Sequence, residues 1–203
     1  IETRTGKVLE EHLLSKEAAK KAIAIGRKYD TLLEVYFDGQ GYAQKDEIAQ
    51  VRKYHKNPNM WDYFLRTRIA VDSLEDLLDE KEGNLDKVQM LFADMEEREE
   101  AWKELEREGV FELVGSLQYN IEINAVGVNK GTGLVNLGKM LGIRREEIMA
   151  CGDGDNDIAM LKEVGFGVAM ANAEEKVKAV ADYITESNND EGVAKAIEKF
   201  VLK

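Results

Sequence analysis

The segment from Glu146 to Leu161 constrains the fold of this chain more than any other. A short apolar run, residues 148–151, leads through Gly152 to three aspartates at alternate positions, and apolar residues at helical spacing follow from Ile158. This pattern predicts a strand, an acidic turn and a helix. In open parallel sheets, ligands collect outside the carboxyl ends of the strands, so a hard cation and an anionic substrate are expected to meet there. The cation is expected to be Mg²⁺, and the aspartates are Asp153, Asp155 and Asp157.

Two plainer interpretations of the acidic turn need to be weighed. Asp155 or Asn156 could serve only as a helix cap, by accepting hydrogen bonds from free backbone N–H groups. Asp153 differs because it lies at the strand end, and acids so close together repel one another unless something positive neutralises them. An EF-hand loop would need Gly at its sixth position and Glu at its twelfth. Counted from Asp153, those positions hold Ile158 and Val164, which excludes an EF-hand.

The segment from Gly152 to Leu161 resembles the last acidic motif of the haloacid dehalogenase-like phosphohydrolases, in the GDxxND-x-x-M-L form of their Cof-type branch. Residues 129–133 resemble the lysine motif of that branch, and residues 167–173 resemble its next strand and turn. In all, the resemblance covers about residues 119–203, in the order and spacing of the family. It implies a Mg²⁺-dependent phosphatase that hydrolyses small phosphorylated metabolites, such as sugar phosphates, through a phosphoaspartate.

The resemblance also implies roles for four residues. Asp153 is expected to bind Mg²⁺ directly, and Asp157 either to bind the ion as well or to orient the group that does. Asn156 is expected to contact the phosphate. Lys130 is expected to neutralise the phosphoryl group and, with Asp153, to act in catalysis. A lysine at the start of a helix is electrostatically unfavourable, which favours this functional role over a purely exposed one.

The family mechanism requires an aspartate nucleophile in an Asp-x-Asp-Gly-[Ser/Thr] motif, and the 203 residues contain no such string. The nearest string, residues 36–40, has Tyr36 in the place of the nucleophile and Gln40 in the place of Ser or Thr. We therefore expect a truncated piece of a longer hydrolase that is inactive by itself. A start codon at or just before Ile1 would instead favour a non-catalytic binding or regulatory module. A phosphomutase with a related cap is a third alternative.

The pattern along the chain changes between its two halves. Up to residue 117 short helices and strands alternate irregularly, which predicts an antiparallel α+β region over residues 1–117, and the resemblance implies that this region is a cap domain. Residues 117–125 alternate strictly between apolar and polar, as in a strand with one buried face. Strands and helices then alternate, which predicts a right-handed parallel layer over residues 118–203. The predicted fold class is α/β, with a partial Rossmann-like parallel core layer and an α+β cap domain. Gly115 and Gly127 are the expected hinges.

Composition limits the partners. The sequence is 44% hydrophobic and 33% charged, with no apolar run long enough to span a membrane, so we expect no membrane partner. A net charge of -12 without a basic stripe argues against nucleic acid. Cys151 is the only cysteine, which excludes an intrachain disulfide and favours the cytoplasm. We also expect self-association, because one flank of the parallel sheet would lack a partner strand.

Overall fold

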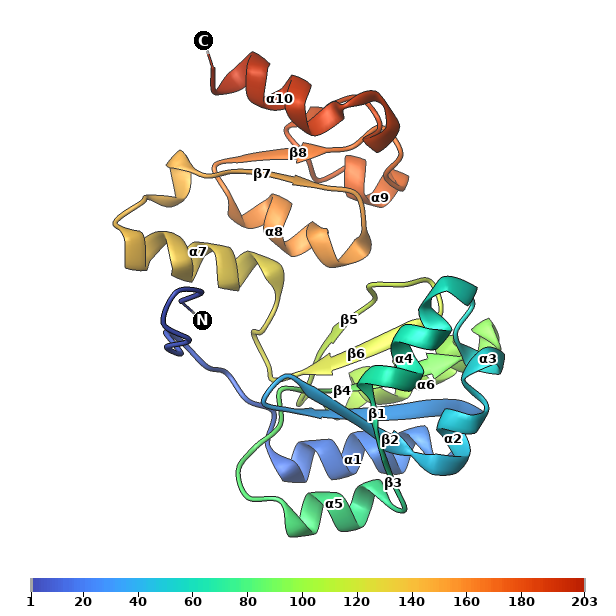
Figure 1. Ribbon diagram of the computed structural model, residues 1–203. Helices are drawn as coiled ribbons and strands as arrows, with labels where there is room; N and C mark the ends of the chain where they lie inside the picture. The colour runs from blue at the N-terminus through green and yellow to red at the C-terminus, as the bar shows by residue number, and fades with distance from the viewer. Residues whose placement is uncertain (1, 203) are drawn as a thin grey trace. The chain divides into compact units, whose positions relative to one another are not determined.

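The computed structural model describes residues 2–202, and the chain divides into two compact units, Ile1–Val126 and Gly127–Lys203 (Figure 1). Each unit has its own sheet and its own hydrophobic core. Among residues 2–202, none of the helices combines the length and the apolar character that a membrane crossing requires.

The first unit is built on a six-stranded sheet with the strand order β3-β2-β1-β4-β6-β5. Its strands are β1 (Thr31–Phe37), β2 (Gln40–Gln44), β3 (Ile69–Val71), β4 (Lys87–Phe92), β5 (Glu112–Val114) and β6 (Asn120–Asn124). Neighbouring strands are antiparallel except for the β2–β3 pair, which is parallel. The sheet is therefore mainly antiparallel, as the sequence predicts.

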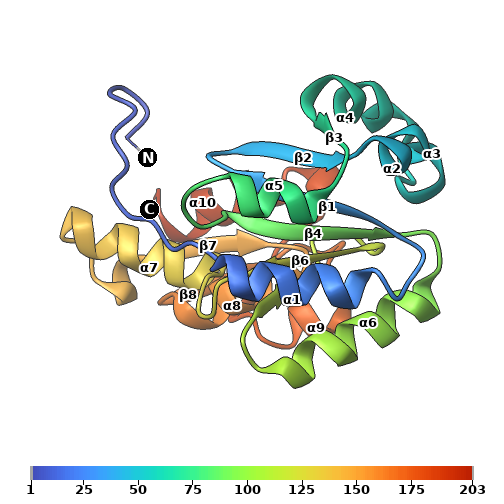
Figure 2. The same cartoon turned by 90° about the horizontal axis from the view of Figure 1, so that it is seen from below.

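Helices pack on both faces of this sheet. One face carries the larger core, where α1 (Lys16–Gly26), α5 (Leu74–Glu80) and α6 (Met95–Glu108) bury Ile23, Leu78 and Leu105 against the strands. Figure 2 shows α1 and α6 running beside the strands of this sheet. A smaller core on the other face includes Tyr54 and Phe64. The helices there are α2 (Lys45–Ala49), α3 (Val51–Tyr54), the 3-10 turn η1 (Pro58–Met60) and α4 (Trp61–Thr67).

The second unit is a parallel α/β layer. Its sheet has the order β7-β8-β9, and both strand pairs are parallel. The strands are β7 (Met149–Gly152), β8 (Phe166–Ala169) and β9 (Tyr183–Ile184). The helices are α7 (Lys130–Leu141), α8 (Ile158–Glu163), α9 (Glu175–Lys178) and α10 (Gly192–Phe200), with 3-10 turns η2 (Arg145–Glu147), η3 (Asp155–Asp157) and η4 (Asn188–Asp190). Leu161, Ala169 and Val177 form the centre of its core.

The structure confirms the predicted fold class, because the chain combines a parallel α/β layer with a mainly antiparallel α+β unit. The predicted boundary between residues 117 and 118 is wrong, since the units divide after Val126. The reason is β6, which pairs with β4 and β5 in the sheet of the first unit. The roles of the first unit as a cap and of the second as part of a hydrolase core stay predictions.

Candidate functional site

The structure confirms the predicted strand, acidic turn and helix. Strand β7 ends at Gly152, Asp153 follows at once, η3 spans Asp155–Asp157, and α8 begins at Ile158. The backbone between β7 and α8 is therefore short, and it holds three carboxylates at the carboxyl end of a parallel strand. In open α/β sheets this is the edge at which ligands bind.

Asp157 is buried, with 7% of its side chain exposed, and folds back over the strand end. Its Oδ2 accepts hydrogen bonds from the backbone N–H groups of Asp153, at 2.9 Å, and of Gly154, at 3.0 Å. Gly152 makes this position available, because a Cβ there would lie 2.4 Å from the Asp157 Cβ. Burial by itself would raise the pKa of Asp157, but the bonds from Lys130, Gly154 and Asp153 hold that pKa below its usual value.

Lys130 reaches Asp157 from the first turn of α7. Asn129 caps this helix by accepting hydrogen bonds from the N–H groups of Gly131 and Thr132, both at 3.0 Å. Helix α7 packs closely on α8, since a Cβ at Gly131 would lie 2.7 Å from the carbonyl oxygen of Ala159. This approach brings Lys130 Nζ within 2.5 Å of Asp157 Oδ1, while half of the lysine side chain stays exposed.

The other two carboxylates of the turn have partners from other elements. Lys176, in α9, places its Nζ 2.5 Å from Asp155 Oδ2, and this bond raises the pKa of the lysine. Asp153 Oδ2 accepts a hydrogen bond of 3.0 Å from the side-chain amide of Asn172. Among residues 2–202, Asp153 forms no ion pair within 4.0 Å. Lys130 and Lys176 pair with other carboxylates and do not neutralise Asp153.

The donor set near the turn is sparse for a metal. Over the described part of the chain, no three His, Cys, Asp or Glu side chains gather as a ready-made metal site. Mg²⁺ in proteins commonly takes one or two carboxylates and several waters, and the exposed Asp153 fits one such position. Both oxygens of Asp157 are already engaged, which favours its orienting role over direct binding. Asn156 is half-buried in the turn, and its contact with phosphate stays a prediction.

Two residues near the turn were missed from the sequence as partners of the acids. Asn172 lies in the segment 167–173 that resembles the family, and the signal for its role is its place in the turn after β8, the strand beside β7. Lys176 carried no signal, because a lysine in a polar helix is usually a solvated residue. Burial raises the pKa of the Cys151 thiol, which disfavours the reactive thiolate.

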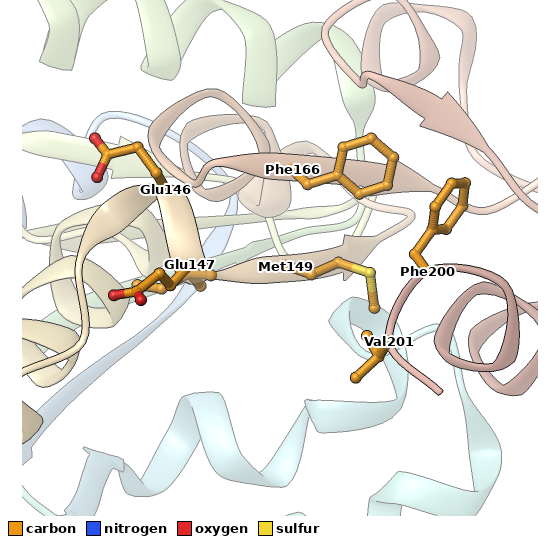
Figure 3. Close-up of a pocket in the computed structure, with 7 residues that line it drawn as sticks. Glu146, Glu147, Met149, Phe166, Phe200 and Val201 are labelled. Atoms are coloured by element: carbon orange, nitrogen blue, oxygen red, sulfur yellow. The ribbon is translucent and has the colours of Figure 1, made fainter. Parts of the chain in front are cut away.

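Two hollows with mainly apolar linings flank β7, which is an edge strand of its sheet, and Glu147 lines both of them. One, of about 450 Å³, lies between the sheet and the end of α10, where Met149 and Phe166 point toward Phe200 and Val201 (Figure 3). The other, of about 260 Å³, lies between α7 and the loop before β7. Its lining includes Leu134, Leu137, Leu141, Ile143 and Ile148. Neither hollow holds the basic groups that a phosphate would need.

Comparison with known proteins gives a consistent result. The family model of the haloacid dehalogenase-like hydrolases matches residues 1–197. The chain is 50% identical over 105 residues to the 5-amino-6-(5-phospho-D-ribitylamino)uracil phosphatase YcsE of Bacillus subtilis. The aligned residues make up 52% of this chain and 42% of that enzyme. It is 45% identical over 87 residues to a phosphoglycolate phosphatase of Methanosarcina mazei, covering 43% and 38% of the two chains. The chain thus matches less than half the length of these relatives.

Solved structures share the fold over nearly the whole chain. A haloacid dehalogenase-like hydrolase from B. subtilis superposes with a TM-score of 0.81 at 25% identity, covering 97% of this chain and 74% of that one. Another, from Bacteroides thetaiotaomicron, gives a TM-score of 0.73 at 27% identity, covering 97% and 71%. These matches confirm the resemblance to the Cof-type branch. Because the family model spans almost all of its residues, the chain belongs to the haloacid dehalogenase-like hydrolases.

Proposed function

We propose that the acidic turn after β7 is the metal- and phosphate-binding side of a Mg²⁺-dependent phosphatase for small phosphorylated metabolites. The observation that carries this proposal is the charge arrangement of the turn. Lysines neutralise Asp155 and Asp157, whereas Asp153 is held by a neutral amide and keeps its charge for a cation. The phosphatase names of the matched relatives support the same reaction class.

Each side chain of the turn then has a task. Asp153 would hold Mg²⁺, and the bound ion would neutralise charge on the phosphoryl oxygens. Lys130 is half exposed, so its ammonium can turn part of its hydrogen-bonding capacity toward a phosphate. Asp157 holds this lysine and the two turn N–H groups in place. Asn156 would donate its amide hydrogens to the phosphate.

The nucleophile is not among these residues. The 203-residue sequence contains no Asp-x-Asp-Gly-[Ser/Thr] string, so a phosphoaspartate would have to form on a carboxylate supplied from outside it. We therefore propose that the 203-residue chain alone does not turn over phosphate esters and binds Mg²⁺ weakly. Small metabolites, rather than nucleic acid or a membrane, are the proposed partners, in the cytoplasm.

The open edge of β7 supports a proposal of self-association. The outward backbone groups of this strand have no partner strand in residues 2–202. Apolar hollows lie on both sides of the strand, and Leu137, Leu141 and Ile143 beside it are 44%, 64% and 41% exposed. An unpaired strand edge between apolar surfaces is a template for pairing with another chain.

The proposed activity can be tested by comparing the 203-residue chain with the product of the complete reading frame. With an aryl phosphate as substrate, the complete product should release phosphate only when Mg²⁺ is present, and the 203-residue chain should not. Lys130→Gln in the complete product should reduce turnover strongly. Its matched control is Lys139→Gln, an exposed lysine at the other end of α7, which should not change turnover. Comparable turnover by the 203-residue chain would show that it contains a nucleophile after all.

A further inference from the structure

Asn172 connects Asp153 to a second loop of the same unit. Its Nδ2 donates a 3.0 Å hydrogen bond to Asp153 Oδ2, and its Oδ1 accepts a 2.9 Å bond from the backbone N–H of Asn188. A backbone N–H can only donate, and an ionised carboxylate can only accept. The chemistry of its two neighbours therefore determines which way the Asn172 amide points, and the structure shows the matching orientation.

The loop that holds Asn172 is itself well anchored. The buried hydroxyl of Thr185 donates a 2.7 Å hydrogen bond to the carbonyl of Gly192, and the N–H of Gly192 donates to Ser187 at 3.1 Å. The N–H of Ala171, just before Asn172, donates to the carbonyl of Glu186 at 3.3 Å. These bonds close the segment between β9 and α10 onto the turn after β8. The amide of Asn172 thus has a fixed support on the side away from Asp153.

The three carboxylates of the turn are held by two kinds of partner. Lys130 and Lys176 bring positive charge to Asp157 and Asp155, and each ion pair cancels the charge that it holds. The Asn172 amide brings a donor without a charge. It can orient Asp153 through one oxygen while the carboxylate keeps its attraction for a cation.

We infer that Asn172 is a positioning residue for the metal-binding carboxylate of Asp153, an inference that rests on the proposed function. By holding Oδ2, Asn172 would keep the Asp153 carboxylate in one orientation and leave its other oxygen available to a cation. The N–H of Asn188 completes the arrangement, because it prevents the Asn172 amide from turning its oxygen toward the carboxylate. A purely structural role would connect the two loops without any effect on metal affinity.

The test measures Mn²⁺ binding, by electron paramagnetic resonance of the free ion, to the product of the complete reading frame and its variants. Asn172→Ala removes the amide. Asn188→Pro removes the supporting N–H together with the exposed side chain of Asn188. Proline is tolerated at this first position of η4, and Ser187 already has the extended backbone that precedes proline. Asn189→Ala, at the next and exposed position, is the matched control. Asp153→Asn tests the metal site itself.

We expect Asn172→Ala to weaken Mn²⁺ binding roughly 10- to 100-fold, the usual effect of removing a group that orients a metal ligand. Asn188→Pro should weaken it in the same direction but less, and Asn189→Ala should bind as the wild type does. Saturating Mg²⁺ should restore the turnover of Asn172→Ala, which a folding defect would not allow. Binding that Asp153→Asn abolishes but Asn172→Ala leaves unchanged would overturn this inference and leave the proposed function standing. Binding that survives Asp153→Asn would overturn both.

Discussion

The contact between α7 and α8 yields a prediction in which two glycines of one helix respond in opposite ways. Gly131 faces α8, and a Cβ there would lie 2.7 Å from the carbonyl oxygen and 2.8 Å from the carbonyl carbon of Ala159, which are backbone atoms that cannot swing away. Gly133, two residues on, has no atom within 4 Å of the position that its Cβ would take. Both substitutions to Ala gain the same helix propensity, about 1 kcal/mol.

The magnitudes follow from these distances. Gly133→Ala should stabilise the second unit by up to about 1 kcal/mol, because nothing opposes the gain in propensity. Gly131→Ala must push the helices apart, and forcing an extra methyl group into a tight contact costs about 1–3 kcal/mol. Since the propensity term is common to both, the two variants should differ by about 1–3 kcal/mol in the free energy of unfolding of the second unit.

The assay must report on the second unit alone. Both tryptophans, Trp61 and Trp102, belong to the first unit, so tryptophan fluorescence would follow the wrong part of the chain. Hydrogen exchange with mass spectrometry, measured on peptides from α7 and α8 across a urea series, gives the required free energies. Equal stabilities for Gly131→Ala and Gly133→Ala would refute the close approach of these helices, and with it the reason why Lys130 reaches Asp157.

Two further predictions concern the second unit. Asp157→Asn keeps the shape but places an amide against the Lys130 ammonium, so it should cost about 1–3 kcal/mol at neutral pH by the same exchange assay. The pKa of Asp157 is held below its usual value of 3.8, so the ionised carboxylate stabilises the folded unit above that pH, and this stabilisation is lost as the pH falls through the lowered pKa. The difference in stability between the wild type and Asp157→Asn should therefore disappear at low pH. A difference that does not change with pH would contradict the ion pair between Asp157 and Lys130. Leu141→Lys, at the hollow beside β7, should reduce concentration-dependent association in analytical ultracentrifugation, whereas Val193→Lys, exposed on α10 and outside both hollows, should not. Equal association by these two variants would show that the chains do not associate through the edge of β7.

The sequence was most informative where local pattern decides the structure. The apolar run before Gly152, the alternate aspartates and the helical spacing after Ile158 each depend on neighbours within a few residues, and the strand, turn and helix are all present. The position of Lys130 at the start of α7 follows from an equally local signal, and the structure adds that Asn129 caps this helix.

The domain boundary could not be predicted from such patterns. The alternation in residues 117–125 predicts a strand with one buried face, and β6 is that strand. Its place in the first unit depends on pairs such as Ile121 with Met90 and Ile123 with Val88, which join distant parts of the sequence. Alternation specifies which face of a strand is buried, but it does not specify the neighbouring strand.

The residues that contact the acidic turn could not be predicted from local patterns either. Mutual repulsion of the three aspartates predicts that positive charge is needed nearby, but it does not say which lysines supply it or which carboxylate is left without one. Lys130 comes from the preceding helix, Lys176 and Asn172 come from beyond the next strand, and only the fold brings them to one loop. The resemblance to the family identified the aspartates and Lys130. The structure distinguishes Asp153 from the other two aspartates, because its partner is a neutral amide and not a lysine.

The proposed function depends on Asp153 as the carboxylate that holds the cation. The most direct measurement is Mg²⁺-dependent phosphate release from an aryl phosphate by the product of the complete reading frame, compared between the wild type and Asp153→Asn, with hydrogen exchange to verify that both are folded. We predict that the variant is folded and has no Mg²⁺-dependent turnover. A folded Asp153→Asn variant with unchanged turnover would contradict the claim.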